Sequence, residues 1–415
     1  GFLLTACEGP AGPAGENGND GPAGTNASAT CAACHSSTKV DLIATQFQLS
    51  KHEYGLAAEE EAGNTGCGPC HLQEAFKDVV ARNVSTVFTI VPPATTFSNP
   101  YAAAADHAYG AIGCSTCHSS LHTTYDSTNF YPLTSTAAVP MTMWGGAKTI
   151  NLTQKGGRSN LCVKCHQPRP FTNSGTDRNV LNYDGLAANP TNVFFAASLA
   201  VKVLTPSYRT HTHYGTAGAV YAGKGGVEFT GPITSYTSSA HTTAATCQDC
   251  HMAPMTGKAG GHSMFAKGNF NGCTPCHAAV TATAQDPAYW SLPRAEIQGL
   301  LNSLAAKLQV GGVDIMNRNP DAETNLWAGL TTNKYDGYLN IFDPVNNPLY
   351  ATNNPQTFQN PTVSSSWTAA QKATNLTLPL ITLTNAQMGS IINFQLCLRD
   401  YSLGIHNFRY CKALL

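Results

Sequence analysis

Residues 162–166 spell CVKCH, two cysteines separated by two residues with a histidine directly after the second. This pattern decides how the chain folds, because it recurs six times and uses 12 of the 15 cysteines. The six copies are CAACH (31–35), CGPCH (67–71), CSTCH (114–118), CVKCH (162–166), CQDCH (247–251) and CTPCH (273–277).

The C-x-x-C-H pattern is the attachment signature of c-type haem, in which two thiols form thioethers with the porphyrin and the adjacent histidine ligates the iron. Zinc ribbons and thioredoxin-like sites also use C-x-x-C, but neither requires a histidine directly after the second cysteine. The sequence therefore predicts six haem c groups, each with its iron. The expected thioether residues are Cys31, Cys34, Cys67, Cys70, Cys114, Cys117, Cys162, Cys165, Cys247, Cys250, Cys273 and Cys276. The expected proximal ligands are His35, His71, His118, His166, His251 and His277.

Eight further histidines are available as distal ligands, which is enough to give all six irons a second imidazole. We expect bis-histidine ligation with these distal ligands: His52, His107, His213, His241, His262 and His406. His211 and His122 are additional candidates, and His122 could instead hydrogen-bond a haem propionate. In an extended strand residues i and i+2 point to the same side, so His211 and His213 could address two neighbouring irons.

Two of these histidines, His52 and His122, have no motif close behind them in sequence. We expect one of them to be donated to an iron of the next subunit. A ligand donated in trans would fix a head-to-tail contact, which can continue as a filament, whereas an isologous contact would close a dimer.

Composition favours a chain organised around its cofactors. Gly and Pro number 37 and 24, and only 11% of residues are charged. The expected fold is a multihaem cytochrome c, mostly coil with short helices and few strands, built around a chain of six covalently bound haems. The formal charge is −1, and twelve ionised propionates would bring it to about −13, which argues against a nucleic-acid partner.

Three regions are expected along the chain. Residues 1–29 form an apolar N-terminal arm and a collagen-like Gly/Pro linker, 30–285 a hexahaem core, and 286–415 a haem-poor C-terminal region that returns a distal histidine to the core. Helices are expected over 295–308, which has one apolar stripe, and over 385–401, opened by Asn385 as N-cap and closed by Gly404. No segment predicts a transmembrane span.

Three cysteines lie outside the haem motifs. Cys7 ends LLTAC (3–7), which resembles a lipobox, so it is either lipidated or a thiol or disulfide cysteine of an intact arm. Cys397 and Cys411 flank the segment that carries His406. They form either a disulfide that braces this ligand or two buried free thiols.

The C-terminal stretch DYSLGIHN (400–407) resembles the tail of multihaem cytochromes related to pentahaem nitrite reductase and to outer-surface cytochromes of metal-reducing bacteria. The stretches CSTCHSSLHTTYD (114–126), NLCVKCHQPR (160–169), THYGTAGAVYAGKGG (212–226) and CQDCHM (247–252) resemble an outer-surface c-type cytochrome that polymerises into extracellular filaments, or nanowires. The resemblance covers about residues 105–280 and the tail, and implies that His406 is a distal ligand and that the chain is a filament subunit.

The expected function is extracellular electron transfer through a chain of bis-histidine c-type haems. Because eight histidines can close six irons, no open iron is left for a substrate, and no enzyme activity is expected. The expected partners are copies of the chain in a head-to-tail helical filament, other redox proteins and extracellular electron acceptors. Covalent haem attachment implies export across the cytoplasmic membrane to the outer cell surface. The alternatives are a monomeric exported electron carrier and a multihaem reductase.

Overall fold

The computed structural model describes residues 36–55, 67–82, 110–119, 132–144, 146–169, 183–194, 212–231, 235–278, 280, 288–318, 335–339 and 381–415. Several residues singled out by the sequence lie outside these ranges: Cys7, Cys31, Cys34, His35, His107, His122 and His211.

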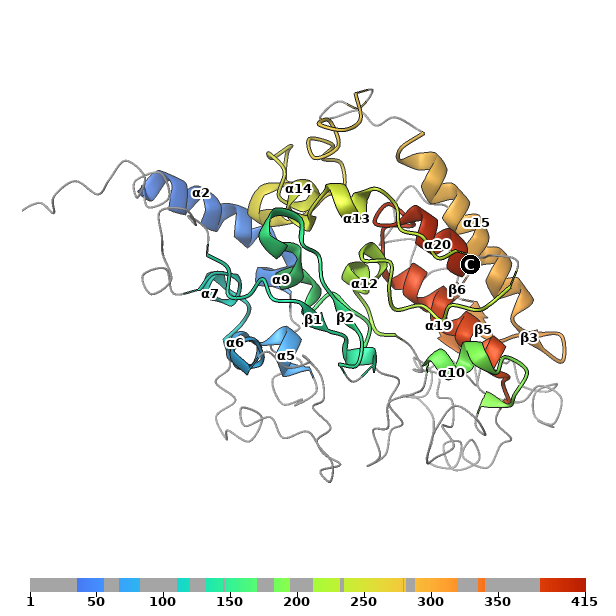
Figure 1. The fold of residues 1–415 in the computed structure, drawn as a ribbon. Helices are drawn as coiled ribbons and strands as arrows, with labels where there is room; N and C mark the ends of the chain where they lie inside the picture. Colours follow the sequence, from blue (N-terminus) through green and yellow to red (C-terminus); the bar gives the residue numbers. More distant parts are fainter. Residues whose placement is uncertain are drawn as a thin grey trace, which may run out of the picture.

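Short helices joined by irregular segments make up most of the described chain (Figure 1). The α-helices are α2 (Ser37–Gln48), α3 (Lys51–Tyr54), α5 (Gly68–His71), α6 (Gln73–Arg82), α7 (Cys114–Cys117), α9 (Ser159–Val163), α10 (Tyr183–Ala188), α12 (Ala217–Tyr221), α13 (His241–Ala244), α14 (Cys247–His251), α15 (Ser291–Lys307), α19 (Asn385–Arg399) and α20 (Phe408–Leu414). The 3-10 helices are η1 (Thr142–Trp144), η2 (Gln154–Gly157) and η3 (Gly261–Ser263).

The described strands form two-stranded antiparallel ladders. β1 (Val139–Pro140) pairs with β2 (Thr149–Ile150), and β3 (Gln309–Val310) pairs with β4 (Val313–Asp314). β5 (Met316–Arg318) pairs with β6 (Tyr335–Leu339), with a register irregularity between Met316 and Arg318. Because each ladder is so small, helix packing rather than sheet formation supplies most of the buried core.

The two expected helices are present. α15 buries Ile297 and Leu301 of the predicted stripe, while α19 is buried on nearly all sides because apolar residues surround its axis. The sequence predicted Asn385 as the N-cap of α19, but Asn385 is the first residue of the helix and Thr384 is its N-cap. Its hydroxyl accepts a hydrogen bond from Gln387 N at 3.2 Å, and Gln387 Oε1 accepts one from Thr384 N at 2.9 Å. This reciprocal capping box satisfies two amide groups at the start of the helix.

The expected end of this helix was also wrong. α19 ends at Arg399, before the predicted closure by Gly404. Tyr401, Leu403 and Gly404 all have positive φ, so the backbone leaves the helix and forms a tight loop. Since non-glycine residues rarely adopt this conformation, the loop is held by its surroundings.

One hydrophobic core joins segments from both sides of residue 285. It contains side chains from residues 139–227 and from α15, α19 and α20. In Figure 1, α15, α19 and α20 lie together near the C-terminus, and α2 lies at the opposite end of the molecule. The motif-bearing helices α5, α7, α9 and α14 lie in the same half of the view as α2, on the opposite side from the C-terminal helices.

Cys397 and Cys411 lie side by side but as buried thiols, so the expected disulfide is not formed. The structure matches the alternative of two buried free cysteines. The contact with Cys397 and burial both raise the pKa of Cys411 well above its ordinary value. Disulfide formation proceeds through the thiolate, which this environment disfavours.

Asn393 joins three segments inside the core. Its side chain accepts a hydrogen bond from Val227 N at 2.7 Å and donates to the carbonyls of Val227 and Leu414 at 2.9 and 3.3 Å. We expect Asn393→Ala to lower the free energy of unfolding by roughly 2–4 kcal/mol, because it leaves buried backbone groups unpaired. Denaturant unfolding followed by circular dichroism measures this, with Asn302→Ala on α15 as control. Equal midpoints for the two variants would contradict the assigned role.

Candidate functional site: paired imidazoles on the cysteine motifs

The C-x-x-C-H motifs share a local geometry that follows from their spacing. The backbone N–H of the histidine donates to the carbonyl of the first cysteine in four described motifs, at distances of 2.9 to 3.1 Å. The donors are His71, His118, His166 and His277. This is one turn of helix, in which residues three and four apart lie on one face. Both thiols and the imidazole are therefore presented from the same turn.

The fifth motif is fixed further by side chains and by the fourth motif. Thr246 caps α14 through a capping box with Asp249, which also pairs with Lys155 at 2.5 Å. Cys247 N donates to Ser159 Oγ at 3.1 Å, and Gln248 Nε2 donates to Arg158 O at 3.1 Å. Helices α14 and α9 are thus docked together by hydrogen bonds.

Each of the five described motif histidines lies beside one different histidine that the sequence predicted as a distal ligand. The ring centroids are 6.0 to 6.4 Å apart. The pairs are His166 with His52, His71 with His213, His118 with His262, His277 with His241, and His251 with His406. The partners are far apart in sequence, so the folded chain alone brings them together.

This separation suits a metal ion between two imidazoles. Two metal–nitrogen bonds of about 2 Å, plus about 1.1 Å from each nitrogen to its ring centre, give roughly 6.2 Å between centroids. Edge-to-face ring contacts span about 4.5 to 7 Å, so a metal is indicated by the recurrence of this separation at five motif histidines rather than by the distance alone. The residues at each described motif therefore fit a haem: two thiols for the thioethers and one imidazole on each side of the iron.

The ring pairs fall into two orientation classes. Three pairs are nearly perpendicular, with interplanar angles of 80°, 81° and 87°. They are the pairs of His166, His71 and His277. The pairs of His118 and His251 are closer to parallel, at 36° and 30°.

Burial favours the neutral form, which is the form that binds a metal, in five of these imidazoles. It lowers the pKa of His52, His118, His251 and His262 below the ordinary value. Burial and the neighbouring histidines, His52 first among them, lower the pKa of His166 to about 3. His406 differs: burial alone would lower its pKa, but the charge and hydrogen bond of Asp400 raise it.

The structure places two of these histidines differently from what the sequence suggested. His52 lies beside His166 of its own chain, whereas the sequence suggested it as a donor to the next subunit. The reason is the packing of α2 on η3, where Gln46 Oε1 accepts a hydrogen bond from His262 N at 3.0 Å. His213 has φ of +73°, so the extended strand expected over 211–213 does not include this residue; His211 lies outside the described residues.

Cysteines of different motifs lie in contact. The thiols of Cys165 and Cys70 lie beside each other, and so do those of Cys162 and Cys247. These contacts join the second, fourth and fifth motifs directly. In addition, Gln73 Oε1 accepts from the hydroxyls of Ser115 and Thr116 at 2.9 and 3.2 Å, which ties the second motif to the third. Four motifs therefore form one contiguous cluster.

Lys164, between the cysteines of the fourth motif, is 1% exposed. Its Nζ has no hydrogen-bond partner among the described residues. Burying an unpaired ammonium is costly, and burial lowers the pKa of Lys164. A carboxylate such as a haem propionate would satisfy this group, so the lysine is a second feature that fits the expected cofactor. The sequence CVKCH shows that a lysine lies between the two cysteines, but it does not show that this lysine is buried.

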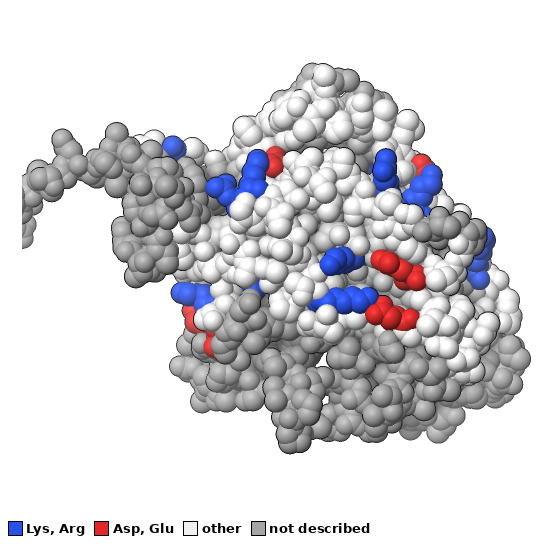
Figure 2. All heavy atoms as spheres, viewed as in Figure 1, with Lys and Arg blue, Asp and Glu red and all other residues white. Residues whose placement is uncertain are grey.

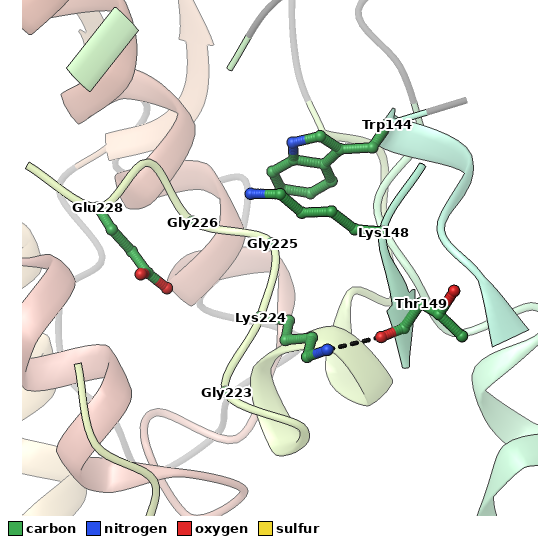
Figure 3. Close-up of a pocket in the computed structure, with 8 residues that line it drawn as sticks. All are labelled: Trp144, Lys148, Thr149, Gly223, Lys224, Gly225, Gly226 and Glu228. Carbon is green, nitrogen blue, oxygen red and sulfur yellow. Dashed lines mark hydrogen bonds between the residues drawn. The ribbon is translucent and has the colours of Figure 1, made fainter. Parts of the chain in front are cut away.

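A cavity of about 280 Å³ lies apart from the paired imidazoles (Figure 3). Its lining residues are Trp144, Lys148, Thr149, Gly223, Lys224, Gly225, Gly226 and Glu228, with no histidine or cysteine. Lys148 Nζ lies over the Trp144 ring and pairs with Asp184 at 2.6 Å, and Lys224 Nζ donates to Thr149 O at 2.6 Å. Both ammonium groups are thus engaged in the protein's own packing.

The described surface and donor groups limit the other kinds of site. On the face drawn in Figure 2, Lys and Arg are scattered, several beside Asp or Glu, and form no basic stripe. In the described ranges no three or more His, Cys, Asp or Glu side chains are grouped to hold a metal ion. A structural zinc site needs four such ligands, whereas a haem iron takes two from the protein. None of the described helices combines the length and apolar character needed to cross a membrane.

A scan against protein-family models and searches of curated proteins and of solved structures each found no match.

Proposed function

We propose that the chain is a hexahaem c-type cytochrome that transfers electrons outside the cell as the subunit of a head-to-tail filament. The observation that carries this proposal is the one-to-one pairing of five motif histidines with five other histidines at 6.0 to 6.4 Å. When bound, haem c supplies a one-electron couple at each iron.

The protein's own residues would hold and orient these groups. Each motif turn offers two thiols and one imidazole, and a distant segment brings the second imidazole. With both axial positions taken by histidine, no open position remains for a substrate at the five described motifs. This disfavours the reductase alternative and favours electron transfer without catalysis.

Motif contacts support transfer between neighbouring sites. The paired thiols Cys165–Cys70 and Cys162–Cys247 would be the attachment points of adjacent haems, so the edges of those haems would lie close together. The buried Lys164 would supply a positive charge to a propionate in this cluster. Extracellular location, filament assembly and redox partners follow from the family resemblance and from export of c-type cytochromes.

The first test is spectroscopic. The purified protein should carry six covalent haems by mass, all low-spin when oxidised. Electron paramagnetic resonance should resolve two classes of low-spin signal, because the angle between axial imidazole planes sets the splitting of the iron orbitals. Of the described pairs, three belong to the perpendicular class and two to the near-parallel class. A high-spin signal equal to one haem would instead favour the reductase reading.

Lys164→Met should shift one haem to a more negative reduction potential, since removal of a nearby positive charge favours the ferric state. Potentiometric titration measures the shift, and Lys224→Met, at the cavity, is the control. If both variants have wild-type potentials, Lys164 does not face a haem.

The five described pairs use five motif histidines and five of the other eight histidines. The sixth motif histidine is His35, and we expect its partner to be His107, His122 or His211. Changing the true partner to Ala should leave six covalent haems but turn one iron high-spin. If that histidine comes from the neighbouring subunit, the same change should also abolish filaments in negative-stain micrographs. His262→Ala is the matched control, because it should free one iron within its own chain and leave filaments intact.

Filaments that persist in all three single variants would contradict donation of a ligand in trans. Compact particles in the wild-type protein would favour the monomeric carrier.

A further inference from the structure

In four of the paired histidines, Nδ1 faces an acceptor whose chemistry differs from site to site. His406 Nδ1 lies 2.5 Å from Asp400 Oδ1, and the Asp400 side chain is fully buried. His251, its ring partner, donates from Nδ1 to the carbonyl of Met264 at 2.8 Å. Both imidazoles of this pair are therefore hydrogen-bonded through Nδ1, which leaves Nε2 of each to face a metal.

Asp400 is itself held by the tight loop that follows α19. Ser402 donates to Asp400 Oδ2 from its hydroxyl, and from its N–H at 3.3 Å. His406 N donates to Ser402 Oγ at 3.0 Å, and Arg294 Nη1 donates to Ser402 O at 3.1 Å. The loop thus presents one carboxylate oxygen to His406 and uses the other for its own structure.

Neutral acceptors meet the imidazoles of two other pairs. His241 Nδ1 lies 3.0 Å from Ile405 O, and His52 Nδ1 lies 3.1 Å from Met264 Sδ. A thioether is a weak acceptor, a carbonyl a stronger one, and a carboxylate forms a charge-assisted bond about twice as strong as a neutral one. Met264, which has positive φ, serves two sites with two different atoms.

We propose that Asp400 is a positioning residue that gives the His251/His406 site a more negative reduction potential than the His52/His166 site. This inference rests on the proposed haem ligation. A carboxylate hydrogen-bonded to a ligand histidine fixes the tautomer, so that Nε2 faces the metal, and raises the basicity of the ring. The more basic ring, together with a buried negative charge, stabilises ferric iron over ferrous iron.

The test is a potentiometric titration of the haem-loaded protein with Asp400→Asn. Asparagine keeps the shape and an acceptor oxygen but removes the charge. The site should keep its low-spin signal of the near-parallel class. The equilibrium ratio of ferric to ferrous iron at this site should fall about tenfold, which corresponds to a reduction potential about 59 mV more positive for a one-electron couple. Asp184→Asn removes an exposed carboxylate that pairs with Lys148 and should leave every potential unchanged.

A second variant distinguishes electrostatic control from mere support of the loop. Ser402→Ala removes one donor from Asp400, which concentrates charge on the carboxylate, so the same site should shift towards negative potential. Shifts of opposite sign in the two variants are expected. Equal potentials in Asp400→Asn and wild type, or loss of low-spin ligation at this site in both variants, would overturn the proposal. A wild-type chain without covalent haem would overturn the proposed function as well, whereas a loaded chain with unmoved potentials would overturn only the role of Asp400.

Discussion

The gap between paired imidazoles is the constraint on which the rest of the structure depends. A turn of five residues can place two thiols and one imidazole on the same side, but the facing imidazole comes from a distant segment. His52 and His166 are over a hundred residues apart in sequence, and so are His71 and His213. To form such a pair, the chain must close a loop of more than a hundred residues. The conformational entropy lost in closing this loop is not offset by local structure. The protein must therefore fix its connections by other contacts, and the core around α19 supplies many of them.

Sequence spacing predicts what is local and fails where distant segments meet. The motif turns follow from i, i+3 and i+4 spacing, and helices α15 and α19 follow from apolar patterning and helix-forming residues. All five histidines that lie opposite the described motif histidines were predicted as candidate ligands. The partner of each was not, because nothing in HTTAATCQDCH (241–251) tells that His241 faces His277 rather than the motif directly after it. His52 was assigned to a neighbouring subunit for the same reason: sequence distance does not reveal that α2 packs on η3.

The polar network in the tail explains why its short motif contains the residues it does. In DYSLGIHN, Asp400 and Ser402 hold the loop and His406 faces His251. Gly404 has φ of +89°, and a Cβ there would come within 2.7 Å of Ile297 Cγ1, so glycine is required by both backbone and packing. Asn407 Oδ1 accepts from Ser239 N at 2.8 Å, which connects the tail to the segment before His241. The sequence pattern contains all of these residues, but only the distances show that Asp400, Ser402 and Asn407 hold the loop while His406 faces a motif histidine.

Core and sites meet in this tail. Helices α19 and α20 bury apolar side chains on the side of the large core, and the loop between them carries His406 to the motif cluster. Displacement of this loop would disturb the capping of α20 by Asn407 and the contact of Arg294 with Ser402. The position of the His406 imidazole is thus tied to the stability of the core rather than to a flexible connection. By contrast, α2, with no buried residue of its own, depends on the contact with η3 to hold its neighbour His52 in place. The chain therefore combines one paired histidine, His406, that is anchored by hydrophobic packing with another, His52, whose position depends on a few polar contacts.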